Sequence, residues 1–516
     1  MAFSMRISEV IARDTTGLLG KHPSWERVAL GDVASILNGA PFDSALFAQG
    51  EGFPLLRIRD VVAGSTTTTY LGDYEPSYVV NAGDLLIGMD GDFNSAFWRS
   101  TPALLNQRVC KVTPNESFYV RGFLAKVLPG YLTAINSHTP SVTVKHLSSK
   151  TVGEIELPLP PLAEQARIDA KLDELLSDLD AGVAELKAAQ RKLALYRQSL
   201  LKAAVEGALT ADWRARNPPT ETGAQLLERI LQQRRTRWEA RQLAKFKEQG
   251  KAPPKGWRTK YLEPVAPDIA DLPPLPPGWV WSTIDQLAQV GTGVTPLRSK
   301  LAYFDNGAIP WVTSGALNSE FVAKATGMIS ELALKECRLE MYPVGALLVA
   351  MYGEGKTRGM CSELRMPATI NQAIAALVLE ADASNCKAYL KSFLFSNYAK
   401  MREQASGGVQ PNLNLQIIRS VVLPLPSVAE QIEITRVVES HFELIGFQRN
   451  ALALARKQSA AQRKNILQAA FSGQLVPQDS SDEPASVLLA RIRAERAAQA
   501  GNKTTTRSRR KAMQAP

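Results

Sequence analysis

The sequence predicts an α+β protein in which two mixed α/β domains alternate with two long helices that pair antiparallel as a coiled-coil-like spacer. Three observations lead to this fold class. A motif recurs 266 positions further along the chain, each copy of it opens a long stretch with helical periodicity, and the region ahead of each copy carries short apolar runs broken by glycine and proline. A chain of 516 residues is long enough for several such domains.

The internal repeat is clearest in two landmarks that keep one spacing. Residues 157–165 read LPLPPLAEQ and residues 423–431 read LPLPSVAEQ, while Leu201–Leu209 resembles Leu467–Leu475 at the same distance of 266 positions. No insertion or deletion therefore separates the two landmarks in either copy. We expect a segment of fixed length in each half of the chain.

Ahead of these landmarks the two copies match more loosely. Trp25 corresponds to Trp279 at a distance of 254 positions, and Asn106-Gln107 corresponds to Asn371-Gln372 at a distance of 265. The distance grows along the chain until it reaches its constant value. The first part of each copy therefore accepts insertions, and the second part does not.

The fixed segments are predicted to be long helices. No further proline lies between Pro161 and Gly207, and apolar residues recur at steps of three, four and seven, which is the helical period. Some forty residues at about 1.5 Å each give a rod of about 65 Å, which can bury its apolar stripe only against a partner. The other copy is the obvious partner, and a coiled coil that serves only for oligomerisation is the alternative. The residues expected to pack on these helices or against partners are Ile168, Leu172, Leu175, Leu179, Leu186, Ile434, Val438, Phe442, Ile445 and Leu452.

These patterns divide the chain into seven parts. They are an N-terminal extension (residues 1–20), a first mixed domain (21–160), a first spacer helix (161–207), a basic helical and proline-rich connector (208–275), a second mixed domain (276–426), a second spacer helix (427–475), and a C-terminal helix with a basic tail (476–516). We expect the end of this tail, where Arg507, Arg509, Arg510 and Lys511 follow a run of threonines, to be a disordered, solvated segment.

Polar loops between the expected strands carry the chemistry needed to contact nucleic acid. Asparagine, glutamine and arginine can form paired hydrogen bonds with purine edges, and lysine and arginine can neutralise phosphates. Each loop taken alone is more often an ordinary solvated turn. The candidate DNA-binding residues are Asp90, Asp92, Asn94, Ser95, Lys145, Arg298, Lys300, Lys356, Arg358, Gln410 and Asn412.

Composition argues against several other classes of protein. Residues 1–20 mix charged side chains among the apolar ones, unlike a signal peptide, and no apolar run approaches the roughly 20 residues of a membrane span. The four cysteines and four histidines are scattered without metal-ligand spacing, so neither disulfides nor a metal site is expected. We therefore expect a cytoplasmic protein, and its net charge of +10 is compatible with a nucleic-acid partner.

The LPLPPLAEQ and LPLPSVAEQ segments, each opening a long helix, resemble the conserved regions of the specificity (S) subunits of type I restriction-modification enzymes. The starts at Trp25 and Trp279, the Gly83-Asp-Leu-Leu turn and the Asn106-Gln107 pair are similar to that family's target recognition domains. The resemblance covers residues 21–497. It implies that each mixed domain reads one half of a bipartite, asymmetric DNA site and that the helix pair sets the spacing between the halves.

The resemblance also implies partners and a division of labour. A specificity subunit has no catalytic residues of its own and docks two methyltransferase (modification) subunits, which restriction/translocase subunits join. The assembled complex would be a DNA adenine methyltransferase and an ATP-dependent endonuclease in the prokaryotic cytoplasm. S-adenosylmethionine, ATP and Mg²⁺ are expected on the partner subunits, with no cofactor in this chain.

The residues alone leave two other functions open. A non-DNA-binding helical scaffold for a multisubunit complex would have the same long helices, and an independent modification enzyme would methylate DNA without partners. Two motifs argue little for further chemistry. Gly355-Lys356-Thr357 is typical of the end of a nucleotide-binding loop, but Ala350 stands where that loop needs glycine, and Asn217-Pro218-Pro219-Thr220 lacks the aromatic residue of the amino-methyltransferase motif.

The connector is a departure from the family pattern. Its basic helix precedes a stiff proline-rich run, and it either touches DNA backbone or a partner, or is simply a solvated surface helix. The basic and aromatic residues of this helix are Arg234, Arg235, Arg237, Trp238, Arg241, Lys245 and Lys247.

Overall fold

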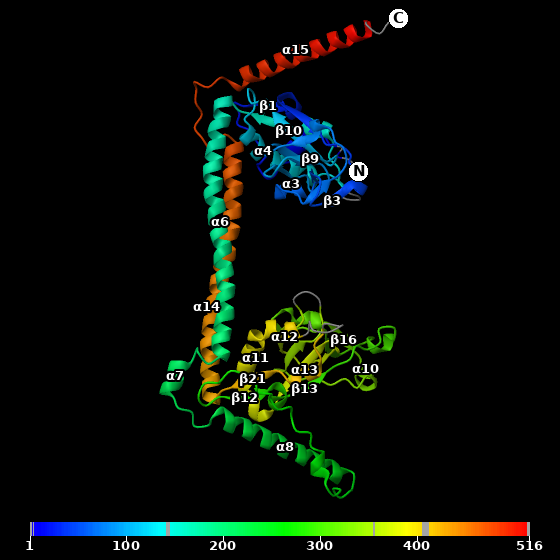
Figure 1. Ribbon diagram of the computed structural model, residues 1–516, viewed down its shortest axis with the longest axis vertical. Coiled ribbons are helices and arrows are strands. Elements are labelled where there is room, and N and C mark those ends of the chain that lie inside the picture. The colour runs from blue at the N-terminus through cyan, green and yellow to red at the C-terminus, as the bar shows by residue number, and fades with distance from the viewer. Residues whose placement is uncertain (1–2, 4, 141–144, 354–356, 405–411, 513–516) are drawn as a thin grey trace. The chain divides into compact units, whose positions relative to one another are not determined.

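The computed structural model describes residue 3 and residues 5–140, 145–353, 357–404 and 412–512. The chain forms two compact units (Figure 1). Unit 1 comprises Met1–Lys187 and Ala453–Pro516, and unit 2 comprises Ala188–Leu452. Each unit contains one mixed domain and one end of each long helix, so the predicted fold class is confirmed.

The two fixed segments are single helices of equal length. Helix α6 (Leu162–Val205) and helix α14 (Val428–Phe471) each have 44 residues, or about 66 Å at 1.5 Å per residue. A glycine with positive φ follows each helix, Gly207 and Gly473, both at φ 74°. Glycine takes this left-handed conformation without the steric cost that a side chain brings, so it ends a helix cleanly.

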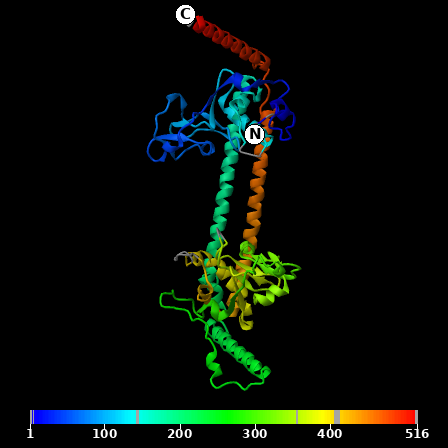
Figure 2. The ribbon, with the colours of Figure 1, turned by 90° about the vertical axis from the view of Figure 1, so that its right-hand side faces the viewer.

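The two helices run antiparallel within each unit (Figures 1 and 2). In unit 1, Arg463 forms an ion pair with Asp180, and Phe471 shares a buried core with Ile168. In unit 2, the Arg197 guanidinium lies 4.6 Å from the centre of the Phe442 ring. Residues later in α6 therefore contact residues earlier in α14, which is the antiparallel pairing that the sequence predicts.

The mixed domain of unit 1 is built from short strands and short helices. Its strands are β1 (Glu26–Ala29), β2 (Ala34–Asn38), β3 (Phe47–Gln49), β4 (Phe53–Leu56), β5 (Thr68–Tyr70), β6 (Val79–Val80), β7 (Leu85–Gly88), β8 (Ser95–Phe97), β9 (Ala103–Leu105), β10 (Val109–Pro114) and β11 (Glu156–Leu159). Its helices are α1 (Ile7–Ala12), α2 (Leu30–Val33), α3 (Asp60–Ala63), α4 (Arg121–Ser137), α5 (Ser149–Gly153) and the 3-10 turns η1 (Ser44–Leu46) and η2 (Pro76–Tyr78). Helix α15 (Ala485–Ala512) follows α14.

Unit 2 is likewise built from short strands and short helices. Its strands are β12 (Val280–Thr283), β13 (Ala288–Thr292), β14 (Ile309–Val312), β15 (Phe321–Val322), β16 (Gly327–Ile329), β17 (Leu347–Ala350), β18 (Cys361–Leu364), β19 (Thr369–Ile370), β20 (Ile374–Leu379) and β21 (Val422–Leu425). Its helices are α7 (Ala211–Arg216), α8 (Gly223–Glu248), α9 (Ile284–Leu287), α10 (Glu331–Glu336), α11 (Lys387–Ser396), α12 (Tyr398–Gln404), α13 (Leu415–Arg419) and the 3-10 turns η3 (Trp257–Lys260), η4 (Leu301–Tyr303), η5 (Ser314–Asn318) and η6 (Ala381–Cys386).

The two domains share one topology. The main sheet has the order β2-β10-β7-β8 in unit 1 and β13-β20-β17-β18-β15 in unit 2, and the ribbon β1-β11 corresponds to β12-β21. A third sheet contains a parallel pair in both units, β4 with β9 and β14 with β19. Strands β7 and β17 are buried along their whole length, which explains their unbroken apolar sequence. The loosely matched part of the sequence repeat is thus a repeat of the fold.

The LPLP motif joins each domain to its long helix. Its leucines are buried, and the carbonyl oxygen of the proline between them accepts a hydrogen bond from a buried tyrosine. Tyr119 Oη donates to Pro158 at 3.0 Å, and Tyr389 Oη donates to Pro424 at 2.8 Å. Burial raises the pKa of both tyrosines, so each hydroxyl keeps the proton that it donates.

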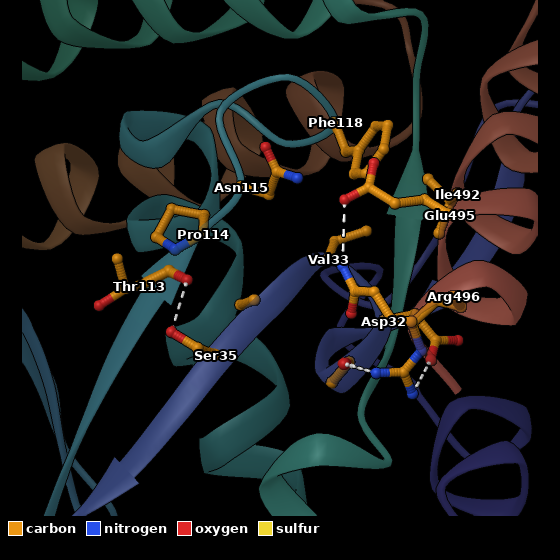
Figure 3. A pocket seen from close by; sticks show the side chains of 13 residues that line it. Asp32, Val33, Ser35, Thr113, Pro114, Asn115, Phe118, Ile492, Glu495 and Arg496 are labelled. Atoms are coloured by element: carbon orange, nitrogen blue, oxygen red, sulfur yellow. Dashed lines mark hydrogen bonds and ion pairs between the residues drawn. The ribbon is translucent and has the colours of Figure 1, made fainter. Parts of the chain in front are cut away.

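A further helix packs on each domain in the same way. Leu226 and Ile230 of α8 are buried in unit 2, and Leu488 and Ile492 of α15 are buried in unit 1. Arg496 of α15 donates to the Gly31 carbonyl at 2.8 Å and pairs with Asp32 at 2.6 Å, beside a hollow of about 400 Å³ lined by β2, β10 and α15 (Figure 3). Arg234 of α8 donates to the corresponding carbonyl, that of Asp285.

The C-terminal segment and the polarity of the helices bear on two further expectations from the sequence. The prediction of a disordered tail is wrong in part, because α15 continues as a helix to Ala512. Alanine and arginine, both strong helix formers, make up most of residues 485–500, ahead of the tail, and a helix once begun is extended more easily than it is started. Each of the described helices is too short or too polar to cross a membrane.

Candidate nucleic-acid interface

In each domain, three segments far apart in the sequence meet at the end of the central buried strand. In unit 1, Met89 N donates to the Arg108 carbonyl at 2.9 Å, and Leu147 N donates to the Met89 carbonyl at 2.7 Å. In unit 2, Met351 N donates to Ala373 at 2.8 Å, and Leu413 N donates to Met351 at 3.2 Å. We call this place the loop edge. It comprises residues 89–95, 106–108 and 145–147 in unit 1 and residues 351–353, 357–358, 371–373 and 412–413 in unit 2.

A glycine brings the first strand of the main sheet against each loop edge. A Cβ atom on Gly39 would lie 2.2 Å from the Asn106 carbonyl oxygen, and one on Gly293 would lie 1.6 Å from the Ile370 carbonyl oxygen. No side chain fits at either position, because backbone atoms cannot move aside as a flexible side chain can. The Asn-Gln pairs of the sequence repeat are therefore held at the same place in both domains.

The structure gives Asp90 and Lys145 internal partners. Asp90 Oδ1 lies 2.6 Å from His146 Nδ1, and Asp90 Oδ2 forms an ion pair with Arg108 at 3.1 Å, with 15% of the Asp90 side chain exposed. Lys145 Nζ donates to the backbone oxygen of Asn136 at 2.7 Å and to its side-chain oxygen at 2.9 Å. These two predicted DNA contacts use their polar atoms to fasten the segments of the loop edge together.

Asp92 and Asn94 lie in the turn between β7 and β8, and Ser95 is the first residue of β8. Between the first two, Phe93 has φ 44° and is 2% exposed. A bulky residue in the left-handed region is uncommon and persists only where the surroundings fix it. The buried Phe93 ring does so here, and Asp92 and Asn94 on either side of it are exposed, while Ser95 is half-buried.

The predicted DNA-binding residues of unit 2 differ from one another in exposure and in their partners. Arg298 is exposed, whereas Lys300 binds the Glu336 carboxylate and lies 3.3 Å from the Tyr303 hydroxyl, and these two partners raise the pKa of Lys300. The backbone oxygen of Arg358 accepts a hydrogen bond from Arg402 Nη1 at 3.2 Å. Asn412 is half-buried at the loop edge. The remaining predictions, Lys356 and Gln410, lie outside the described residues.

Four polar side chains of the loop edges were not among the DNA-binding residues predicted from the sequence. Gln107, Arg108 and Gln372 are exposed, and His146 is half-buried. The Thr295 hydroxyl donates to Gln372 Oε1, which leaves the amide N–H groups of Gln372 to donate elsewhere. The signal was present, because the Asn-Gln pair recurs in the repeat, but the pair served only as a landmark of that repeat.

The residues predicted to pack on the helices differ in burial. Ile168, Leu172, Ile434, Val438 and Ile445 are buried. Leu175, Leu179, Leu186, Phe442 and Leu452 are half-buried. Four of the buried members, Ile168, Leu172, Ile434 and Val438, lie near the start of their helix, where a mixed domain adds its own side chains to the interface. Ile445 lies further along α14. Within the described part of the chain, no cluster of three histidine, cysteine or acidic side chains could hold a metal ion.

Two domains of one fold with unlike loop edges, built on a shared pair of long helices, define a protein that presents two different recognition surfaces. The model of the type I restriction modification DNA specificity domain matches residues 23–188 and 276–453. The chain belongs to this family. Its two mixed domains are accordingly the DNA recognition domains of a type I specificity subunit.

Curated relatives match over nearly the full length. The chain is 34% identical over 522 residues to the EcoBI specificity subunit of Escherichia coli, covering 98% of this chain and 99% of that one. It is 26% identical to the EcoKI specificity subunit of E. coli strain K12, covering 94% and 98% of the two chains. A chain from a solved structure of a type I R-M system shares the fold, with a TM-score of 0.59, 18% identity and coverage of 88% and 99%.

Proposed function

We propose that the two domains read the two halves of one bipartite, asymmetric DNA site through their loop edges. The observation that carries this proposal is the repetition of one fold with different loop edges. Asp92 and Asn94 stand on a short hairpin in unit 1, whereas the corresponding connection between β17 and β18 is longer and has a different sequence. Side chains that differ at equivalent places recognise different base edges, so the half-sites differ.

The helix pair, in this proposal, sets the distance between the half-sites. Helices α6 and α14 have the same number of residues and pair antiparallel, which supports a rod of defined length. A helix resists changes of length because each added residue contributes a fixed rise of about 1.5 Å. The spacer of the DNA site would follow from the number of helical residues.

The helices also supply a docking surface for two methyltransferase (modification) subunits. Phe447 is 73% exposed and Leu444 is 53% exposed on α14, one helical turn apart. Exposed aromatic and aliphatic side chains that are neighbours on a helix are typical of protein interfaces. Restriction/translocase subunits would join the complex through these modification subunits.

The chemistry of the assembled complex belongs to its other subunits. They would bind S-adenosylmethionine, ATP and Mg²⁺ and make the complex a DNA adenine methyltransferase and an ATP-dependent endonuclease in the prokaryotic cytoplasm. This chain would contribute recognition and no catalytic group. The relatives named as specificity subunits of restriction enzymes support this division.

An exchange of one domain tests the proposal. Residues 21–160 are replaced with the corresponding domain of the EcoBI relative, and the chain is co-expressed with its modification subunits in cells that lack other DNA methylation. Sequencing of methylated genomic DNA should show one half of the motif changed and the other half retained. A motif that changes in both halves, or in neither, would contradict the proposal.

The same preparation addresses the helical scaffold as an alternative. A scaffold would retain the modification subunits on purification but would not retain duplex DNA of the methylated motif above a scrambled duplex. The wild-type complex serves as the control for both measurements.

A further inference from the structure

The connector that follows α6 carries a folded and strongly basic extension. We call residues 238–261 the basic arm, which comprises the second half of α8, the turn after it and η3. It contains seven lysines and arginines against two glutamates, so 24 residues hold half of the chain's net charge of +10. None of its residues belongs to the loop edge of unit 2.

Aromatic side chains hold the basic arm in one shape. The Trp238 and Trp257 rings stack with centroids 5.8 Å apart and an interplanar angle of 21°, and Tyr261 meets Trp238 edge-on at 5.3 Å. Phe246 meets Trp257 edge-on at 6.0 Å. Helix α8 is followed by Gly250 at φ 63°, which turns the chain back toward these rings.

The cations of the basic arm divide into two groups. Arg258 pairs with Glu239 at 3.2 Å. The other six point into solvent and form no ion pair with any residue that the structure describes. These six are Arg241, Lys245, Lys247, Lys251, Lys255 and Lys260.

Six unpaired cations on one short segment destabilise its folded shape unless an anion neutralises their charge. Unpaired cations close together repel one another, and that repulsion opposes a compact shape. The aromatic contacts oppose it, because each such pair contributes about 0.5–1.5 kcal/mol beyond its buried area. An arm already ordered in this way avoids much of the entropy cost of binding a partner.

We propose that the basic arm binds the phosphate backbone of duplex DNA outside the base pairs that the loop edges read. The inference rests on the proposed function only in that the assembled complex holds DNA. Lysine supplies five of the seven cations, and lysine is depleted in protein–protein interfaces but common at phosphates. The chemistry therefore favours nucleic-acid backbone over a docked protein.

The test uses the complex of the full chain with its modification subunits. One variant carries Lys245→Gln, Lys247→Gln, Lys251→Gln and Lys255→Gln, and the matched control carries Arg at the same four positions. All four side chains are exposed and lie outside the aromatic cluster, so the substitutions should preserve the fold. Binding is measured over a series of salt concentrations, on a duplex limited to the methylated motif and on one extended by about 20 base pairs on each side.

Each neutralised phosphate contributes about 0.9 to the slope of log K against log salt. On the extended duplex, the glutamine variant should lose about two to four units of slope, and affinity should fall at least tenfold at about 0.1 M salt. The arginine control should behave as the wild type. On the short duplex the three proteins should differ little, and their methylated motif should be identical.

Three results would overturn the inference. They are an unchanged slope on the extended duplex, an equal loss on both duplexes, or loss of the modification subunits from the glutamine variant, which would make the basic arm a protein-docking surface. Failure of the proposed function itself would look different, because the wild-type complex would then not prefer the methylated motif.

Discussion

The indole Nε1 of Trp25 donates a hydrogen bond of 2.9 Å to Glu164 Oε2, and Trp279 Nε1 donates one of 2.8 Å to Glu430 Oε2. All four side chains are buried. The bond ties the start of each domain to the first turn of its long helix. It explains why the tryptophan and the Ala-Glu-Gln sequence recur together in both copies.

The second oxygen of each glutamate accepts from the segment that follows the opposite helix. Glu164 Oε1 accepts from the Gln478 amide, and Glu430 Oε1 accepts from Thr210 Oγ1 at 2.7 Å and from Arg214 Nε at 3.1 Å. Each glutamate therefore closes a joint between a domain, the start of one helix and the end of the other.

Burial raises the pKa of Glu164 above its ordinary value of 4.5. The folded state then holds the proton more tightly than the unfolded state, so stability falls as pH rises from about 4.5 through the folded pKa. Glu164→Gln cannot ionise and should lack this loss. Urea unfolding of both proteins from pH 4 to pH 7 measures it, and a difference between them that does not change with pH would contradict the assignment.

The architecture was predictable because it depends on periodic and repeated patterns. Apolar steps of three and four, and an absence of proline, are enough to specify helices such as α6 and α14. The internal contacts of Asp90 and Lys145 were not predictable, because their partners His146 and Asn136 come close only in the folded loop edge, and His146 lies 56 positions further along the chain than Asp90. A loop carboxylate looks the same in the sequence whether it faces DNA or a neighbouring arginine.

Asp90 and Asp92 should therefore respond differently to the same substitution. Asp90→Ala removes the partner of Arg108 and His146 and should lower the free energy of unfolding by about 1 kcal/mol, since both partners are partly exposed. Asp92 is exposed, and Asp92→Ala should stay within about 0.5 kcal/mol of the wild type. Urea unfolding of the two variants checks this, and equal stabilities would show that the ion pairs of Asp90 do not stabilise the loop edge.

Gln107 and Gln372 form a matched pair for testing the loop edges. A glutamine amide can pair with an adenine edge, and losing one such contact costs about 1–3 kcal/mol of discrimination. Gln107→Ala should relax one base pair in the half-site read by unit 1, and Gln372→Ala should relax one in the other half. Methylome sequencing of each variant reports both halves at once, so each variant is the control for the other. An intact motif in both variants would remove these glutamines from base recognition.

The helix pair can be lengthened by insertions into both helices at the boundary between the two units. Ala188 of α6 and Leu452 of α14 stand at the boundary between the units, so four residues inserted after each would lengthen both helices by about 6 Å. One DNA step is about 3.4 Å, and the spacer of the methylated motif should grow by one or two base pairs while both half-sites stay the same. Insertion into α6 alone, near Ala188, offsets the paired apolar faces and should destabilise the complex more than the double insertion does. A double-insertion complex that is folded and active but methylates the original motif would refute the helix pair as the ruler.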